Sequence, residues 1–171
     1  MAGRPPDTQG GPGFVDQPEE AVLTTSGRQF IVEADGGSRG NPGPAAYGAV
    51  VRDPQTFEVL AAEGLPIGRA TNNVAEYRGL IAGLEMARDL DPTAALDVRM
   101  DSKLVIEQMA GRWKIKHPDM KPLALQATRL RPASVTWTWV PREQNKAADA
   151  LVNRALDGDP VRRQYPVDRP R

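Results

Sequence analysis

The spacing of apolar residues changes partway along the chain, and this change constrains the fold more than any other feature. Three short runs rich in β-forming residues (29–34, 47–52 and 59–65) come first, separated by turn residues, which predicts a meander of three strands. Residues 72–90 then place apolar side chains at helical spacing with no internal proline, which predicts a long amphipathic helix.

The remainder of the chain alternates between the two patterns. Residues 96–100 and 134–140 are predicted strands, and residues 102–110, 118 or 119 to 130, and 145–156 are predicted helices. A meander followed by alternating helices and strands implies one mixed sheet with helices packed on it. The predicted fold class is therefore α/β.

Length and composition predict one domain between two segments without regular structure. The chain has 171 residues, of which 40% are hydrophobic, and this is enough to fill one core. Residues 1–27 are rich in glycine and proline with no apolar periodicity, so a disordered tail is expected there. Residues 158–171 mix arginine with proline and are expected to form a second tail or a linker. The domain is assigned to residues 28–157.

Charge and cysteine content exclude several classes of protein. With 22 Lys plus Arg against 22 Asp plus Glu, the chain is not a globally basic nucleic-acid binder, so any such attraction depends on where the charges lie. The absence of cysteine excludes disulfide scaffolds, thiolate zinc sites and thiol nucleophiles. There is no apolar run of about 20 residues and no secretion signal, so a cytoplasmic protein with no membrane association is expected.

Two aspartates stand where a ligand site is expected. Asp35 and Asp101 each end a predicted strand, and if these strands are central and parallel, both side chains emerge at the same edge of the sheet. Open α/β sheets place their ligands at that edge. Gly36 and Gly37 follow Asp35, and the missing Cβ atoms would let a ligand approach the backbone closely.

Two further carboxylates complete a candidate set of four. Glu76 lies on the apolar face of the predicted helix 72–90, and Asp149 lies in the first turn of the last helix if Asn145 is its N-cap. Each carboxylate alone is equally explained by turn or helix-terminus chemistry. Four together repel one another unless cations hold them, and ligands that offer only oxygen select Mg²⁺ or Mn²⁺. Two such ions about 4 Å apart form the known arrangement for phosphodiester cleavage.

Around these carboxylates the sequence resembles the type 1 ribonuclease H family. The matching segments, in the family's order, are D-G-G-S-R-G-N-P-G-P-A-A-Y-G at 35–48, T-N-N-V-A-E-Y at 71–77, M-D-S-K-L-V-I at 100–106 and N-K-A-A-D-A-L at 145–151. The resemblance implies a five-stranded mixed sheet flanked by helices. It also implies a metal-dependent endonuclease that hydrolyses the RNA strand of RNA/DNA hybrids and leaves 5′-phosphate and 3′-hydroxyl ends.

The resemblance also implies roles for individual residues. Asp35 would bridge two Mg²⁺ ions, with Mn²⁺ as the alternative metal. Asp149 would help to hold the ion that activates the attacking water, and Glu76 and Asp101 would hold the ion facing the leaving oxygen. The implied substrate contacts are the loop residues Gly36, Gly37 and Ser38, the minor-groove readers Asn41, Asn72 and Asn73, and the DNA-phosphate contacts Arg69 and Thr71. Helix capping is the alternative role for Asn72.

One position departs from the family pattern. Many members carry a histidine in the loop after the last strand, whereas this loop reads V-P-R-E-Q-N, with Arg142 near that position. Arginine stays protonated, so Arg142 is a candidate for stabilising phosphate charge but not for shuttling a proton. The lone histidine, His117, lies in a different segment and is expected to be a loop residue rather than a catalytic one.

A local excess of positive charge gives this neutral chain a way to hold a polyanion. The segment 103–131 has seven basic residues and two acidic ones, and within it W-K-I-K interleaves Trp113 with Lys114 and Lys116. This pattern suits contact with a DNA backbone. A core position for Trp113 is the equally weighted alternative.

The sequence is also compatible with other functions. The main alternative is a catalytically inactive ribonuclease H-like module that only binds nucleic acid, although all four acidic positions are filled. A DNA-cutting relative of the integrase or junction-resolving type and a glycoside hydrolase are less favoured. The asparagine pair suits ribose recognition, and aromatic residues make up only 5% of the chain. The expected partner is an RNA/DNA hybrid, bound by a monomer with no obligate protein partner.

Overall fold

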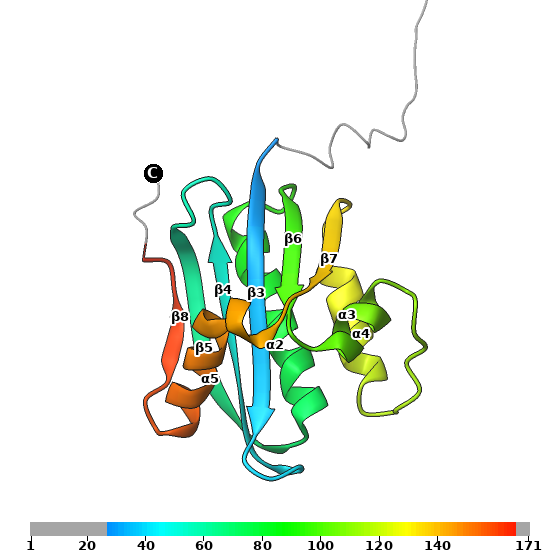
Figure 1. Cartoon of the computed structure of the whole chain (residues 1–171). Coiled ribbons are helices and arrows are strands. Elements are labelled where there is room, and N and C mark those ends of the chain that lie inside the picture. Colours follow the sequence, from blue (N-terminus) through cyan, green and yellow to red (C-terminus); the bar gives the residue numbers. More distant parts are fainter. Residues whose placement is uncertain (1–26, 167–171) are drawn as a thin grey trace, which may run out of the picture.

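A six-stranded mixed sheet forms the centre of the computed structural model, which describes residues 27–166 (Figure 1). In the order in which they lie side by side, the strands are β7 (Val135–Trp139), β6 (Ala95–Met100), β3 (Gln29–Ser38), β4 (Gly43–Arg52), β5 (Val59–Ala70) and β8 (Val161–Gln164). The strands β3, β4 and β5 form an antiparallel meander, β6 and β7 run parallel to β3, and β8 pairs antiparallel with β5. The α/β class and the mixed sheet agree with the sequence prediction.

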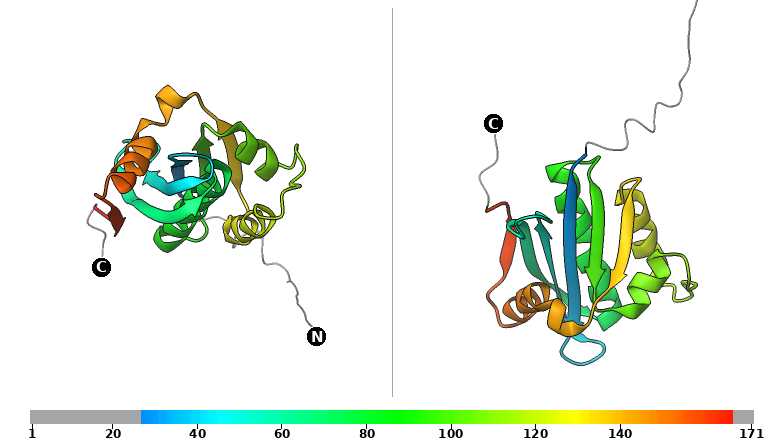
Figure 2. Two further views of the ribbon diagram at one scale, coloured as in Figure 1. Left: turned by 90° about the horizontal axis from the view of Figure 1, so that it is seen from below. Right: turned by 45° about the horizontal axis from the view of Figure 1, so that its top comes forward.

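Helices cover the two faces of this sheet (Figure 2). Helix α2 (Asn72–Leu90) packs on β3, β4 and β5, and α4 (Lys121–Leu130) packs against α2. Helix α5 (Lys146–Leu156) lies on the opposite face, over β4, β5 and β3. The short helix α3 (Lys103–Met109) follows β6, and a 3-10 turn, η1 (Arg142–Gln144), precedes α5. None of the helices in the described region has the length and apolarity needed to cross a membrane.

The long helix α2 begins and packs as its sequence predicts. Thr71 is its N-cap, and the Thr71 hydroxyl accepts a hydrogen bond from the Val74 amide at 3.2 Å. The apolar stripe, including Tyr77, Leu80 and Leu84, is fully buried against the sheet. The Tyr77 hydroxyl reaches the Gln108 side chain of α3 at 2.7 Å, so this buried polar group has a partner.

The sheet has six strands, so the expectation of five is wrong. The sixth strand, β8, lies in the segment 158–171 for which no regular structure is expected. The two prolines nearest to β8, Pro160 and Pro166, stand outside it and leave its backbone amides free to pair. Residues 1–26 and 167–171 lie outside the described residues, so the predictions for the two tails stay untested there.

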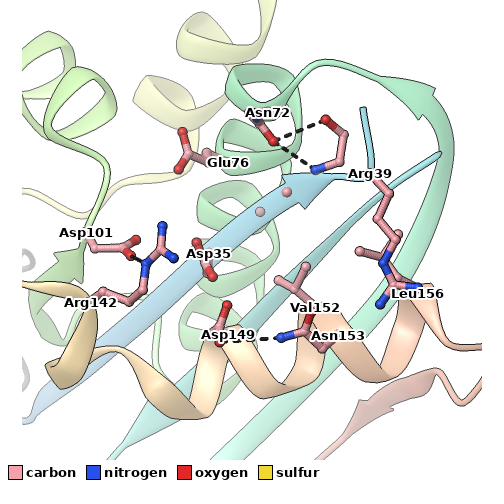
Figure 3. A pocket seen from close by; sticks show the side chains of 13 residues that line it. Asp35, Arg39, Asn72, Glu76, Asp101, Arg142, Asp149, Val152, Asn153 and Leu156 are labelled. Atoms are coloured by element: carbon pink, nitrogen blue, oxygen red, sulfur yellow. Dashed lines mark hydrogen bonds and ion pairs between the residues drawn. The ribbon is translucent and has the colours of Figure 1, made fainter. Parts of the chain in front are cut away.

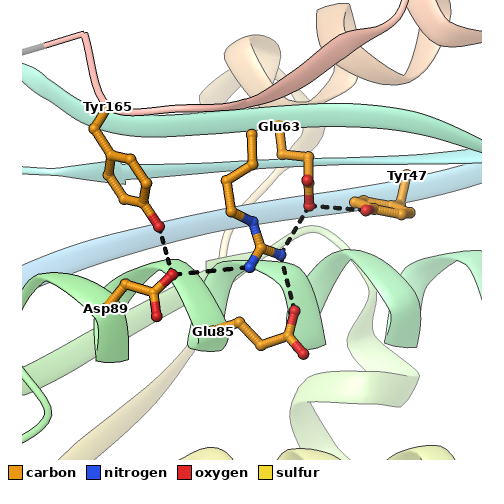
Figure 4. A network of polar contacts seen from close by, with 6 residues as sticks. Tyr47, Glu63, Glu85, Asp89 and Tyr165 are labelled. Atoms are coloured by element: carbon orange, nitrogen blue, oxygen red, sulfur yellow. Dashed lines mark hydrogen bonds and ion pairs between the residues drawn. The ribbon is translucent and has the colours of Figure 1, made fainter.

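A polar network attaches β8 to the rest of the domain (Figure 4). The Arg163 guanidinium donates to Glu63 of β5 at 2.9 Å and to Glu85 of α2 at 2.8 Å, and the Tyr165 hydroxyl donates to Asp89. Glu63 also accepts a hydrogen bond from the Tyr47 hydroxyl at 2.8 Å. The partners of Arg163 are far away in sequence, which explains why local patterns give no sign of this strand.

Glycines let both covering helices approach the sheet at backbone distance. A Cβ added at Gly79 of α2 would lie 2.4 Å from the Asp35 carbonyl oxygen of β3, and one added at Gly36 would lie 2.1 Å from the Ala75 carbonyl carbon. On the other face, a Cβ at Gly48 would lie 2.4 Å from the Ala148 carbonyl oxygen of α5. Any side chain at these positions would push the helices away from β3 and β4.

We predict that Gly79→Ala lowers the free energy of unfolding by about 1–3 kcal/mol, because the added methyl group requires α2 to move away from β3. Gly37→Ala is the matched control, since a Cβ there would meet only ordinary contacts at 3.7 and 4.0 Å. Urea denaturation of both variants measures the difference. Equal stability of the two variants would show that the close approach of α2 does not constrain the fold.

Candidate active site

A cavity of about 340 Å³ lies at the sheet edge where β3 and β6 end, between the N-terminal part of α2 and the length of α5. Its walls come from β3 and the turn after it, from α2, from the residue after β6, from η1 and from α5 (Figure 3). The lining residues are Asp35, Gly36, Gly37, Ser38, Arg39, Asn72, Glu76, Asp101, Arg142, Asp149, Val152, Asn153 and Leu156.

All four predicted carboxylates line this cavity. Asp35, Glu76 and Asp101 each offer an oxygen within 4.8 Å of the others. Asp149 faces them from α5, and its charge acts on Asp35 (Figure 3). The sequence thus predicted correctly that residues far apart along the chain meet in one place.

Strand register explains why Asp35 and Asp101 meet. The parallel pairing of β3 with β6 ends at Glu33 opposite Arg99, and each aspartate stands two residues beyond its member of that pair. The expectation that Asp35 ends its strand is wrong, because β3 continues to Ser38 by pairing with β4. Asp35 therefore lies inside a rigid antiparallel ladder, which holds its side chain more firmly than a loop would.

Asp35 and Glu76 are held in an environment that disfavours negative charge. Burial, followed by the charges of Asp101, Glu76 and Asp149, raises the pKa of Asp35 to about 8. Burial also raises the pKa of Glu76 to about 7, against the lowering effects of a Ser102 hydrogen bond and of Arg142. At neutral pH, Asp35 and Glu76 therefore ionise fully only when added positive charge offsets these effects.

The donor set fits a hard divalent cation. Three carboxylate oxygens within 4.8 Å of one another, a fourth carboxylate in the same cavity and no thiolate ligand match the preference of Mg²⁺ and Mn²⁺ for oxygen. The raised pKa values point the same way, since a bound cation would offset the repulsion that causes them.

Asn145 connects the segments that carry three of the carboxylates, Asp35, Asp101 and Asp149. It lies at the N-cap of α5 as predicted, but its side chain makes no capping hydrogen bond. Instead, the fully buried Asn145 amide donates to the Ala34 carbonyl at 2.9 Å and lies 3.4 Å from the Asp101 carboxylate. Sequence reasoning missed this positioning role, because a helix-cap asparagine has the same local signature.

The predicted loop and asparagine contacts also gather here. The side-chain oxygen of Asn72 (Oδ1) accepts hydrogen bonds from the Ser38 backbone amide at 2.8 Å and from the Ser38 hydroxyl at 3.1 Å. The side-chain oxygen of Asn41 accepts a hydrogen bond from the backbone amide of Asn72 at 3.1 Å. These bonds fasten the β3–β4 turn to the start of α2, next to Gly36 and Gly37.

A second cavity, of about 170 Å³, adjoins these asparagines. Asn41, Thr71 and Asn73 line it together with His117 and Asp119. His117 is a loop residue, as expected, yet the fold brings it beside three predicted substrate contacts. Nothing in the sequence around His117 indicates this placement, which depends on how the segment between α3 and α4 folds back towards α2.

Four predicted substrate contacts line neither cavity. Arg69 is exposed on β5, and Trp113, Lys114 and Lys116 are exposed on the segment between α3 and α4. Trp113 is 45% exposed, so the alternative of a core position is wrong. These four residues lie on the surface, where only an extended ligand would reach them.

Arg142 reaches the cavity from η1. Its side chain is 83% exposed, and its Nε lies 3.8 Å from the Asp101 carboxylate. The guanidinium is therefore close enough to act on charges in the cavity and free enough to turn towards a ligand.

The sequence of this chain is similar to a known protein family and to several proteins from other organisms. Residues 33–155 match the model of a family described as reverse transcriptase-like. The chain is 59% identical over 131 residues to a bifunctional protein of Mycobacterium tuberculosis, covering 75% of this chain and 36% of the relative. It is 46% identical over 125 residues to ribonuclease HI of Halobacterium salinarum, covering 72% of this chain and 62% of that protein. The chain thus spans about a third of the first curated relatives' length.

Solved structures show the same similarity to ribonucleases H. The N-terminal ribonuclease H domain of a M. tuberculosis protein, fused to maltose-binding protein, superimposes with a TM-score of 0.74 at 56% identity, covering 77% of this chain and 96% of that chain. The LC11 ribonuclease H1 was isolated from compost. Its complex with an RNA/DNA hybrid superimposes with a TM-score of 0.72 at 38% identity, covering 75% of this chain and 97% of that one.

We predict that Asp35→Asn stabilises the metal-free protein, and that the gain grows between about pH 4 and pH 8. Because folding raises the pKa of Asp35 from 3.8 to about 8, its unfavourable contribution is absent at low pH and complete only above the folded pKa. Asparagine cannot ionise, so the variant escapes this loss. Melting temperatures in EDTA test the prediction, with roughly 2–4 °C expected for each kcal/mol relieved. A gain independent of pH would contradict it.

Proposed function

The chain belongs to the type 1 ribonuclease H family, and we propose that it is an endonuclease that hydrolyses the RNA strand of RNA/DNA hybrids. The observation that carries the proposal is the meeting of Asp35, Glu76 and Asp101 within 4.8 Å, with Asp149 in the same cavity. The hybrid bound to the LC11 ribonuclease H1 supports the choice of substrate.

The four carboxylates are the residues that would hold two divalent ions, with Mg²⁺ expected and Mn²⁺ as the alternative. When bound, such ions supply Lewis acidity towards the scissile phosphate and lower the pKa of water. The chain contributes a rigid frame: Asp35 on a paired strand, Glu76 on α2, and Asp101 beside the Asn145 amide. The expected products carry 5′-phosphate and 3′-hydroxyl ends.

Side chains around the carboxylates supply contacts that suit ribose. Because the Asn72 carbonyl oxygen already accepts from Ser38, its NH₂ group is the part that can donate to a ligand. Asn41 and Asn73 add amide groups that can read 2′-hydroxyls and base edges without demanding a sequence. Thr71 lines the same cavity as Asn73, and Arg69, Trp113, Lys114 and Lys116 would meet the DNA strand on the surface beyond it.

Arg142 is the proposed replacement for the loop histidine found in many family members. Arginine is a permanent cation with several hydrogen-bond donors, so Arg142 would stabilise negative charge on phosphate oxygens rather than carry a proton. Its exposure gives it the freedom to follow a product out of the cavity. The domain start at residue 28 and a monomeric state remain predictions, whereas the predicted end at 157 is too early, because β8 extends the sheet to Gln164.

We predict that the full chain cuts RNA/DNA hybrid in the presence of Mg²⁺ and leaves double-stranded DNA intact. Asp35→Asn is expected to abolish cleavage, because it removes a charge that three neighbouring carboxylates surround. End-labelled hybrid, double-stranded RNA and double-stranded DNA, each with Mg²⁺ or EDTA, test this. Hybrid binding without cleavage by the unaltered chain would indicate the inactive module instead.

Arg142→Ala is predicted to lower kcat by at least about tenfold, the effect typical of losing a group that stabilises charge in the reaction, while divalent ions still bind. Arg154→Ala is the matched control, because Arg154 is a half-exposed arginine on α5 that pairs with Asp159 outside the cavity. Steady-state kinetics on labelled hybrid distinguish the two. Equal rates for both variants would remove Arg142 from the site.

A further inference from the structure

An exposed tryptophan lies beside the active site without a role in the proposed reaction. Trp139 ends β7, and 45% of its surface is exposed. Its indole N–H donates to the Asp101 carbonyl at 3.2 Å, so the ring is anchored directly next to one of the four carboxylate-bearing residues. This hydrogen bond uses only one edge of the ring and leaves a broad apolar surface in solvent.

A cation accompanies this ring. The Lys103 ammonium, on the first residue of α3, lies 5.6 Å from the centre of the Trp139 ring. The Lys103 side chain is 61% exposed. Trp139 and Lys103, which we call the Trp139 surface, therefore combine an aromatic face with a positive charge.

The charge of Lys103 is only partly neutralised by its neighbours. Glu107 lies 3.9 Å from the Lys103 ammonium, but both oxygens of Glu107 accept hydrogen bonds from Arg112. Arg112 also lowers the pKa of Glu107 more than Lys103 does. One carboxylate thus serves two cations, and the cluster keeps a net positive charge that suits a phosphate.

The Trp139 surface continues one end of the active-site cavity. In Figure 3, Asp101 and Arg142 lie at one end of the cavity, Arg39 and Leu156 lie at the other, and Asp35 and Asp149 lie between them. Trp139 holds the backbone of Asp101, and Lys103 follows Asp101 by two residues. A strand that crosses the carboxylates and leaves at the Asp101 end would meet this surface next.

We propose that the Trp139 surface binds the RNA strand of the hybrid beyond the cleavage position, at the Asp101 end of the cavity. The inference rests on the proposed function, because it needs a strand lying across the carboxylates. The indole packs on the sugar or base of one nucleotide, and the Lys103 ammonium contacts the neighbouring phosphate. Aromatic and basic side chains that combine in this way hold nucleic-acid strands without sequence preference.

Hybrid binding in an Asp35→Asn background tests this contact without cleavage. Fluorescence anisotropy of a labelled RNA/DNA hybrid, over a range of salt concentrations, gives Kd and its salt dependence. Trp139→Ala is expected to raise Kd by about fivefold or more, and Trp139→Phe to keep most of the affinity. Lys103→Ala is expected to reduce the slope of log Kd against log salt by about one, since one phosphate contact is lost.

The chain offers a matched control. Phe57 is 49% exposed and has the Arg52 guanidinium 4.3 Å from its ring centre, but it lies in the β4–β5 turn, at the other end of the sheet from the site (Figure 1). Phe57→Ala removes an aromatic–cation pair of the same kind and is expected to leave Kd unchanged.

The possible results separate cleanly. If Trp139→Ala and Lys103→Ala both bind hybrid as well as the Asp35→Asn parent does, the inference is wrong and the proposed function stands. If the parent itself binds no hybrid, the proposed function fails, and the inference fails with it. If Trp139→Ala lowers the melting temperature, its Kd is set aside, and Trp139→Phe and Lys103→Ala test the inference. A purely structural role for the indole would leave the slope of log Kd against log salt unchanged in Lys103→Ala, and that result would contradict the inference.

Discussion

The close approach of two helix backbones to the sheet is the constraint on which the rest of the structure depends. Gly36 and Gly79 allow α2 to lie against the backbone of β3, and Gly48 and Gly64 allow α5 to lie against β4 and β5. Carboxylate side chains are short, so Glu76 and Asp149 reach the same cavity as Asp35 only because the helices carrying them lie this near. Backbone contact between the helices and the sheet therefore positions the four carboxylates.

The clustered, buried carboxylates lower the stability of the metal-free domain. Burial and mutual repulsion raise the pKa values of Asp35 and Glu76, which means that the fold tolerates the cluster rather than gaining from it. Stability must come from elsewhere: from the buried face of α2, from the Asn145 bonds and from the Arg163 network on the far edge of the sheet. At the β8 edge, Arg163 pairs with the buried Glu63, and between β3 and β4 Arg52 pairs with the buried Glu33.

Particular residues show which features of this protein are predictable from sequence. The sequence predicts that Asp35, Glu76, Asp101 and Asp149 share one site, and in the structure all four line one cavity. Strand β8 was missed, because two neighbouring prolines suggest irregular structure and the partners of Arg163 lie far away in sequence. The environments of His117 and Trp139 were also missed, since contacts between separate segments create both.

The sequence by itself determined the α/β class, the long helix and the identity of the acidic cluster, because hydrophobic periodicity and residue chemistry are local properties of the chain. Only the tertiary structure decided that β3 runs past Asp35, that Asn145 holds the Ala34 carbonyl instead of capping its helix, and that a sixth strand closes the sheet. Each of these depends on strand register or on a hydrogen bond between residues distant in sequence. Such pairings form only when the whole chain packs, so no local pattern encodes them.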